Sequence, residues 1–188
     1  MKALALQFLL LFGPIATVMS QGSLDFENLR LGGPNAPVYQ SDGVTPLSGS
    51  QFTAELSAGP TADGLASIAT TGFLTGAAAG YFSGGTQYIM SVPPGNTAWV
   101  QVDVWNTASG ATFAEAKSSG LPNSWWASSV FSVLTGNVPS GAGPTPPGLL
   151  TGLGTSPVYL NSVPEPSALA LVGCGLVMGF LKKGLTSQ

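Results

Sequence analysis

Apolar and polar residues alternate with a period of two through much of the chain between residues 21 and 162. The clearest run covers residues 98–105, where alanine and valine occupy one face and tryptophan, glutamine and aspartate occupy the other. Residues 52–57 alternate in the same way, and residues 24–27 form a shorter run. This period is that of a β-strand with one buried face, so these runs predict strands.

Glycine and proline interrupt the chain every 8–15 residues and separate seven or eight short apolar runs. Residues 66–74, 87–92, 125–134 and 158–161 are the further strand candidates, and residues 112–118 are the one plausible helical turn. Many short strands with glycine and proline turns are typical of two packed sheets. The sequence therefore predicts an all-β passenger domain, an antiparallel β-sandwich of jelly-roll type, over residues 21–162, with a Pro/Gly-rich linker at 139–162.

The first 20 residues have a different pattern. Met1-Lys2 is a short positive segment, residues 3–12 are apolar, and Gly13-Pro14 breaks the run before small residues near position 20. This order predicts a secretory signal peptide over residues 1–20, cut near Gln21 and recognised by the Sec translocon.

The last 26 residues, 163–188, have three parts. Val163-Pro164-Glu165-Pro166-Ser167 comes first, and its prolines favour an extended backbone. Residues 168–181 carry no charge and no proline, and residues 182–188 begin with Lys182-Lys183. An apolar run followed by lysines predicts a membrane helix with its basic end in the cytoplasm. Fourteen residues span about 21 Å, so snorkelling lysines or a thinned bilayer must complete the crossing.

This tail resembles the PEP-CTERM sorting signal of exported bacterial proteins, through Pro164-Glu165-Pro166, the apolar run 168–181 and the pair Lys182-Lys183. The resemblance implies recognition by an exosortase, a membrane protease, with a cut near the Pro-Glu-Pro motif. It also implies a host with a Gram-negative-type envelope, where the protein is held in the inner membrane and then transferred to the cell surface or the extracellular matrix.

Charge is scarce and mostly negative in the passenger domain. Its two basic residues are Arg30 and Lys117, against seven acidic residues, which gives a net charge of 2 − 7 = −5. Nucleic acid requires a basic face, so it is not a predicted partner. The single cysteine, Cys174, lies in the tail, so the passenger domain has no disulfide.

The chain has no histidine, which removes the usual nucleophile–base pairs and the commonest zinc ligand. No phosphate loop, dinucleotide motif or serine-hydrolase elbow is present. Two carboxylate pairs could in principle cleave glycosides, namely Asp25 with Glu27 and Asp103 with Glu55. A solvated strand face is the simpler interpretation of Asp25 and Glu27. The sequence predicts no catalytic residues, no metal and no cofactor, and a protein that is not an enzyme.

One row of side chains suggests ligand binding. Trp99, Gln101, Asp103 and Trp105 share one face of the strand at 98–105, and Trp125-Trp126 could extend the row. Aromatic faces stack on sugar rings, and amide and carboxylate groups hydrogen-bond sugar hydroxyls. The competing interpretation is that these tryptophans pack under loops or against a second sheet.

Three functions remain open from the sequence. The leading prediction is a non-enzymatic exported protein of structural or adhesive type, sorted through its C-terminal tail. The alternative is a module that binds carbohydrate, such as exopolysaccharide, through the tryptophan row. A glycosidase or lyase is the third, disfavoured by the missing histidine and the small size.

Overall fold

The computed structural model describes residues 21–137, 139–140 and 143–161. The predicted signal peptide at 1–20 and the predicted sorting signal at 163–188 lie outside these residues. Among the residues that the structure does describe, none belongs to a helix with the length and apolar character needed to cross a bilayer.

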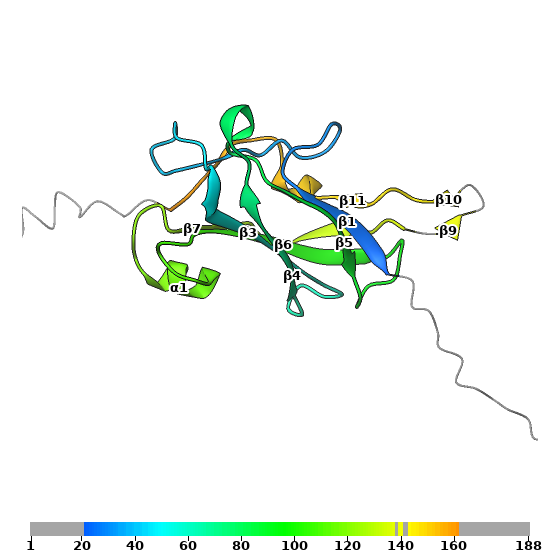
Figure 1. The fold of residues 1–188 in the computed structure, drawn as a ribbon. Helices are drawn as coiled ribbons and strands as arrows, with labels where there is room; N and C mark the ends of the chain where they lie inside the picture. The colour runs from blue at the N-terminus through cyan, green and yellow to red at the C-terminus, as the bar shows by residue number, and fades with distance from the viewer. Residues whose placement is uncertain (1–20, 138, 141–142, 162–188) are drawn as a thin grey trace, which may run out of the picture.

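Strands dominate the described chain (Figure 1). The strands are β1 (Gly22–Glu27), β2 (Val38–Tyr39), β3 (Gly49–Gly59), β4 (Ala66–Phe73), β5 (Ser83–Ile89), β6 (Thr97–Asn106), β7 (Trp125–Ala127), β8 (Phe131–Leu134), β9 (Pro139–Ser140), β10 (Gly143–Pro144), β11 (Gly148–Leu149) and β12 (Val158–Tyr159). The helical elements are α1 (Phe113–Ser118) and two 3₁₀ turns, η1 (Gly76–Ala78) and η2 (Thr151–Leu153). The prediction of an all-β class is confirmed.

Two sheets build most of the domain. The larger has the order β4-β3-β6-β7, with β8 also paired to β6, and the smaller has the order β11-β1-β5. The long pairs β3–β4, β3–β6 and β1–β5 are antiparallel, as predicted. The two-residue pair β1–β11 is parallel, so the smaller sheet is mixed, whereas every pair in the larger sheet is antiparallel. β2 and β12 form a separate parallel pair.

One apolar core receives side chains from both sheets. The alternation along β6 was predicted correctly, because Ala98, Val100, Val102 and Val104 are fully buried. Leu24 and Phe26 of β1 belong to the same buried cluster, and Phe26 packs on Phe82 with ring centroids 5.1 Å apart. The other face of β6, which carries the predicted tryptophan row, therefore points away from this core.

Two predicted strands differ from the structure. The run at 125–134 is not one strand, because the chain leaves β6 after Ala127 and rejoins it at Phe131, pairing with a different part of the same neighbour. Ser128 fills the break: its Oγ accepts a hydrogen bond from the backbone N–H of Val102 at 2.9 Å. The predicted strand at 87–92 begins earlier, at Ser83, and ends at Ile89.

The helical turn predicted at 112–118 is present as α1. Thr112 is its N-cap and forms a capping box with Glu115, in which each side chain binds the other residue's backbone N–H. Only six residues separate the end of β6 from α1. The helix therefore folds back against β6 and β7 instead of extending away from them.

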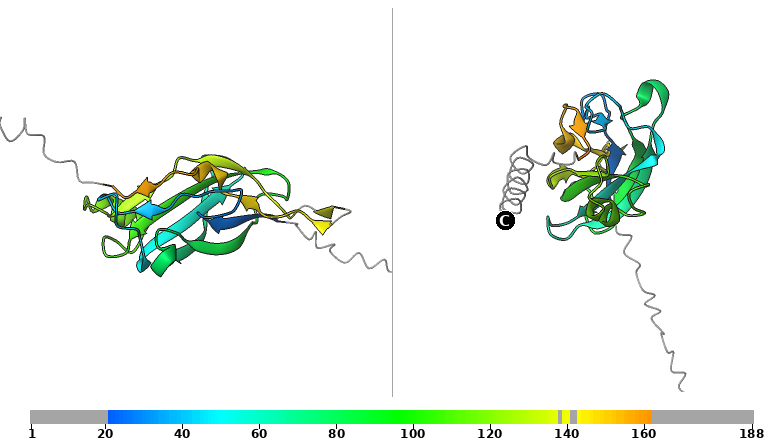
Figure 2. Two further views of the ribbon diagram at one scale, coloured as in Figure 1. Left: turned by 90° about the horizontal axis from the view of Figure 1, so that it is seen from above. Right: turned by 90° about the vertical axis from the view of Figure 1, so that its left-hand side faces the viewer.

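The two ends of the described chain lie far apart. β1 begins at one end of the domain, while α1, β7 and the end of the segment after β12 lie at the other (Figure 1). Figure 2 shows β12 beside β2 at that second end, in agreement with their parallel pairing. The segments that precede residue 21 and follow residue 161 thus join the domain at opposite ends.

Candidate functional site on the outer face of β6

The predicted row on β6 lies on one face of the strand, but its four members differ in exposure. Trp99 is 36% exposed and Gln101 is half-buried, whereas Asp103 is 9% exposed and Trp105 is 4% exposed. The row is thus accessible at its Trp99 end and covered at its Trp105 end.

Helix α1 covers Trp105. The Phe113 ring packs edge-on against Trp105 and Trp125, with centroid distances of 6.4 and 5.8 Å. The Lys117 ammonium nitrogen lies 4.8 Å from the centre of the Trp125 ring, within the range of a cation–π contact. These contacts give Trp105 a packing role, so it does not present a free face for stacking on a sugar.

Asp103 and Glu55 form a directly opposed carboxyl pair. They face each other in the register of β6 with β3. Burial and the nearby Glu55 carboxylate raise the pKa of Asp103 to about 6, although Lys117 acts in the opposite direction. Within the described part of the chain, Asp103 Oδ1 and Trp105 Nε1 are buried without a hydrogen-bond partner. The covered half of the row is therefore polar and desolvated.

We expect Asp103→Asn to stabilise the protein at neutral pH. The pKa of Asp103 is raised from its ordinary value of 3.8, so the folded state binds the proton more tightly than the unfolded state. The resulting stability is present below pH 3.8 and is lost as pH rises through about 6. Asparagine cannot ionise, so the variant should gain about 1–2 kcal/mol at pH 7.5, with solvent screening included.

Urea unfolding at pH 4 and pH 7.5 measures this difference. The control is Asp63→Asn, because Asp63 is exposed between β3 and β4. A gain for Asp103→Asn that is equal at both pH values would contradict the proposed cause.

The Trp99 end is bordered by small polar residues. Ser132 lies opposite Trp99 on β8, and Ser57 lies opposite Gln101 on β3. The Gln101 amide donates to the backbone oxygen of Ser128 at 3.2 Å, which holds its side chain toward the β7–β8 connection. An exposed aromatic ring next to hydroxyl and amide groups has the chemistry to bind a sugar ring.

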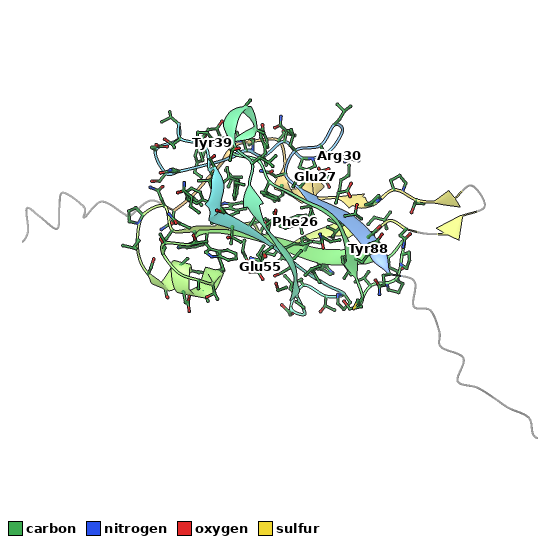
Figure 3. The ribbon with its side chains drawn as sticks, viewed as in Figure 1. Phe26, Glu27, Arg30, Tyr39, Glu55 and Tyr88 are labelled. Atoms are coloured by element: carbon green, nitrogen blue, oxygen red, sulfur yellow. The ribbon has the colours of Figure 1, made fainter. Side chains whose placement is uncertain are left out.

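The other carboxylate pair, Asp25 and Glu27, is paired with a cation. Arg30 lies 2.9 Å from Glu27 and 3.6 Å from Asp25, and Thr86 donates a hydrogen bond to Asp25. Figure 3 shows Glu27 and Arg30 close together and well away from Glu55. Arg30 thereby ties the loop after β1 to the strand.

The described residues contain no group of three or more acidic, cysteine or histidine side chains placed to hold a metal ion. Sequence reasoning weighed the pair Asp103–Glu55 but missed that Lys117 acts on the pKa of Asp103 and that Phe113 packs on Trp105. A signal was present: Thr112 and Glu115 have the spacing of a capping box, and a helix starting so soon after β6 must return to its outer face.

No family model, curated protein or solved structure matches this chain.

Proposed function

We propose that this chain is an exported protein of structural or adhesive type, which reaches the cell surface or the extracellular matrix after sorting through its C-terminal tail. The observation that carries the proposal is the order of Pro164-Glu165-Pro166, the apolar run 168–181 and Lys182-Lys183 at the end of the chain. This order supports recognition by an exosortase while the protein is held in the inner membrane. The signal peptide at 1–20 supports export through the Sec translocon.

The passenger domain suits this role. Among the residues that the structure describes, the buried apolar side chains run from Leu24 to Leu160 and form one core. Two sheets that share one core support the proposal that the passenger is a β-sandwich of jelly-roll type.

Replacing Pro164, Glu165 and Pro166 together by alanine tests the sorting proposal. We expect the variant to stay in the inner membrane with its tail attached, because the protease would lose its recognition segment. Intact mass of the protein from membrane, surface and medium fractions measures the outcome. The matched control replaces Thr155, Ser156 and Pro157 by alanine, upstream of the motif. The proposal would be contradicted if the triple variant were released normally with its tail removed.

A second candidate function is carbohydrate binding, and the exposure of Trp99 is the observation that favours it. The proposed site is smaller than the sequence suggested and consists of Trp99, Gln101 and the neighbouring serines. We expect Trp99→Ala to weaken retention on the host's exopolysaccharide by roughly tenfold, the effect of losing about 1–2 kcal/mol of ring stacking.

Trp105→Phe is the comparison variant for this experiment. It keeps a buried aromatic ring under α1 and should retain the polysaccharide as the parent does. Equal retention of the parent and Trp99→Ala would reject carbohydrate binding at this face and leave the sorting proposal intact.

A further inference from the structure

The described chain ends in a tightly bound residue, Asn161. Its Oδ1 accepts hydrogen bonds from the backbone N–H groups of Ser124 and Trp125, each at 2.8 Å, and its amide donates to Leu121 O at 2.9 Å. The backbone N–H of Asn123 also donates to Asn161 O at 2.9 Å. The end of the described chain, which we call the exit point, is therefore fixed against the loop 121–125.

Three exposed apolar side chains surround this exit point. Val44 is 76% exposed, Leu121 is 50% exposed and Tyr159 is 48% exposed. The Leu121 backbone oxygen accepts a hydrogen bond from the Asn161 side chain, and Tyr159 lies two residues before Asn161. A Cβ placed on Gly43 would lie 3.8 Å from the Tyr159 ring, which puts the Val44 turn beside that ring. We call Val44, Leu121 and Tyr159 the exit patch.

Hydrogen bonds connect the two loops of the exit patch. The Ser41 backbone N–H donates to Asn123 Oδ1 at 2.6 Å, and Asn123 in turn donates to Asn161. Asn123 adopts a positive φ of 55°, a conformation that asparagine tolerates better than most residues. The patch is therefore carried by a connected polar framework and is not a set of unrelated loop tips.

The covalent chain limits how far this patch can lie from the apolar tail. Seven residue-to-residue steps separate Asn161 from Ala168. Even a fully extended chain covers at most about 25 Å in seven steps. If residues 168–181 sit in a bilayer, the exit end of the domain must therefore stay close to the headgroups.

We propose that the exit patch contacts the surface of a lipid bilayer while the tail is in the membrane. This inference rests on the proposed membrane-held intermediate. Tyrosine suits the boundary between headgroups and hydrocarbon, and Leu121 and Val44 would bury apolar surface beside it. Asp42 is in the Val44 turn, and hydrogen bonds from Thr45 and Val44 lower its pKa, so it carries a negative charge there. That charge favours a zwitterionic bilayer over an anionic one.

The contact would orient the domain. The exit patch is at the α1 and β7 end, so the opposite end, where β1 begins, would point away from the membrane (Figure 1). The end of β6 leads into α1, so the start of β6 lies toward the opposite end. Trp99 belongs to this start, and Leu134 of β8 pairs with it. The domain would then present its far end outward while its exit end rests on the lipid.

Bromolipid quenching in vesicles of phosphatidylcholine tests the orientation. The full chain carries Cys174→Ser, and a single cysteine for an environment-sensitive dye is placed by Val44→Cys or Leu121→Cys. The matched control is Met90→Cys, because Met90 is also 76% exposed but follows β5, near the β1 end. We expect dyes at Val44 and Leu121 to be quenched by lipids brominated near the headgroups at least about twofold more than the dye at Met90.

The outcomes separate the two proposals. Protein that floats with the vesicles but shows equal quenching at all three positions overturns the exit patch and leaves the membrane-held intermediate standing. Protein that does not float with the vesicles overturns both. A blue-shifted dye at Val44 without vesicles would show that the chain's own apolar segment covers the patch, which also overturns the lipid contact.

Discussion

Replacing Asn28 by alanine should lower the free energy of unfolding by about 3–5 kcal/mol, because three buried backbone groups would each lose a hydrogen bond. Of the three, Gly80 O keeps a second bond, from the Val38 N–H. Asn28 is 1% exposed. Its amide donates to Ala36 O at 2.8 Å and to Gly80 O at 3.1 Å, and its Oδ1 accepts from the Phe82 N–H at 2.7 Å. One side chain thus joins segments more than 50 residues apart in the sequence.

Urea unfolding at neutral pH measures the loss, and two further variants identify its origin. Asn28→Asp keeps the acceptor for the Phe82 N–H but loses both donated hydrogen bonds. It should therefore also be strongly destabilised. Asn35→Ala removes one exposed hydrogen bond, accepted from the Tyr81 hydroxyl, and should cost less than about 1 kcal/mol. Equal losses for Asn28→Ala and Asn35→Ala would refute the assigned role.

Local patterns were enough to predict the strands that carry the core. Along β6 the alternation is strict, because one face meets the core and the other does not, so a one-residue error would bury Gln101 and expose Val102. Phe113, with Glu115 and Lys117 near it, likewise made α1 predictable. In each case the physical cause lies within a few neighbouring residues.

The covered end of the candidate site could not be predicted in the same way. Trp99 and Trp105 have the same period and chemistry in the sequence, yet only Trp105 lies under α1. Its burial depends on Phe113 and Trp125, which reach it through the path of the chain after β6. The pKa of Asp103 has the same kind of origin, since Glu55 and Lys117 become its neighbours only in the fold.

Polar residues that fasten distant segments were also missed. Asn28 and Asn161 look like ordinary loop residues, because asparagine is common in turns. Their partners lie 8–54 and 36–40 residues away, respectively. No local period marks such a contact, so neither asparagine stood out among the many polar residues of the chain.

Asn161→Ala should cost about 2–4 kcal/mol, the second largest loss that we expect from a single polar residue. It removes the acceptor for the N–H groups of Ser124 and Trp125 and the donor to Leu121 O. Ser124 is fully buried, so water cannot readily replace the lost bond to its N–H. Urea unfolding measures the loss. The control is Asn106→Ala, which removes one exposed local bond, accepted from the Ala108 N–H, and should cost less than about 1 kcal/mol.

The same variant connects stability with the proposed orientation at the membrane. Hydrogen exchange should speed up first at the Trp125 and Leu160 amides. The reason is that the segment around residue 161 is released from the loop 121–125 before the core opens. A dye at Leu121 should then lose part of its bromolipid quenching, since the exit patch is no longer held beside the exit point. If exchange instead increases uniformly across β3 and β6, Asn161 supports the whole domain rather than its exit end. The exit patch would then need a different source of rigidity.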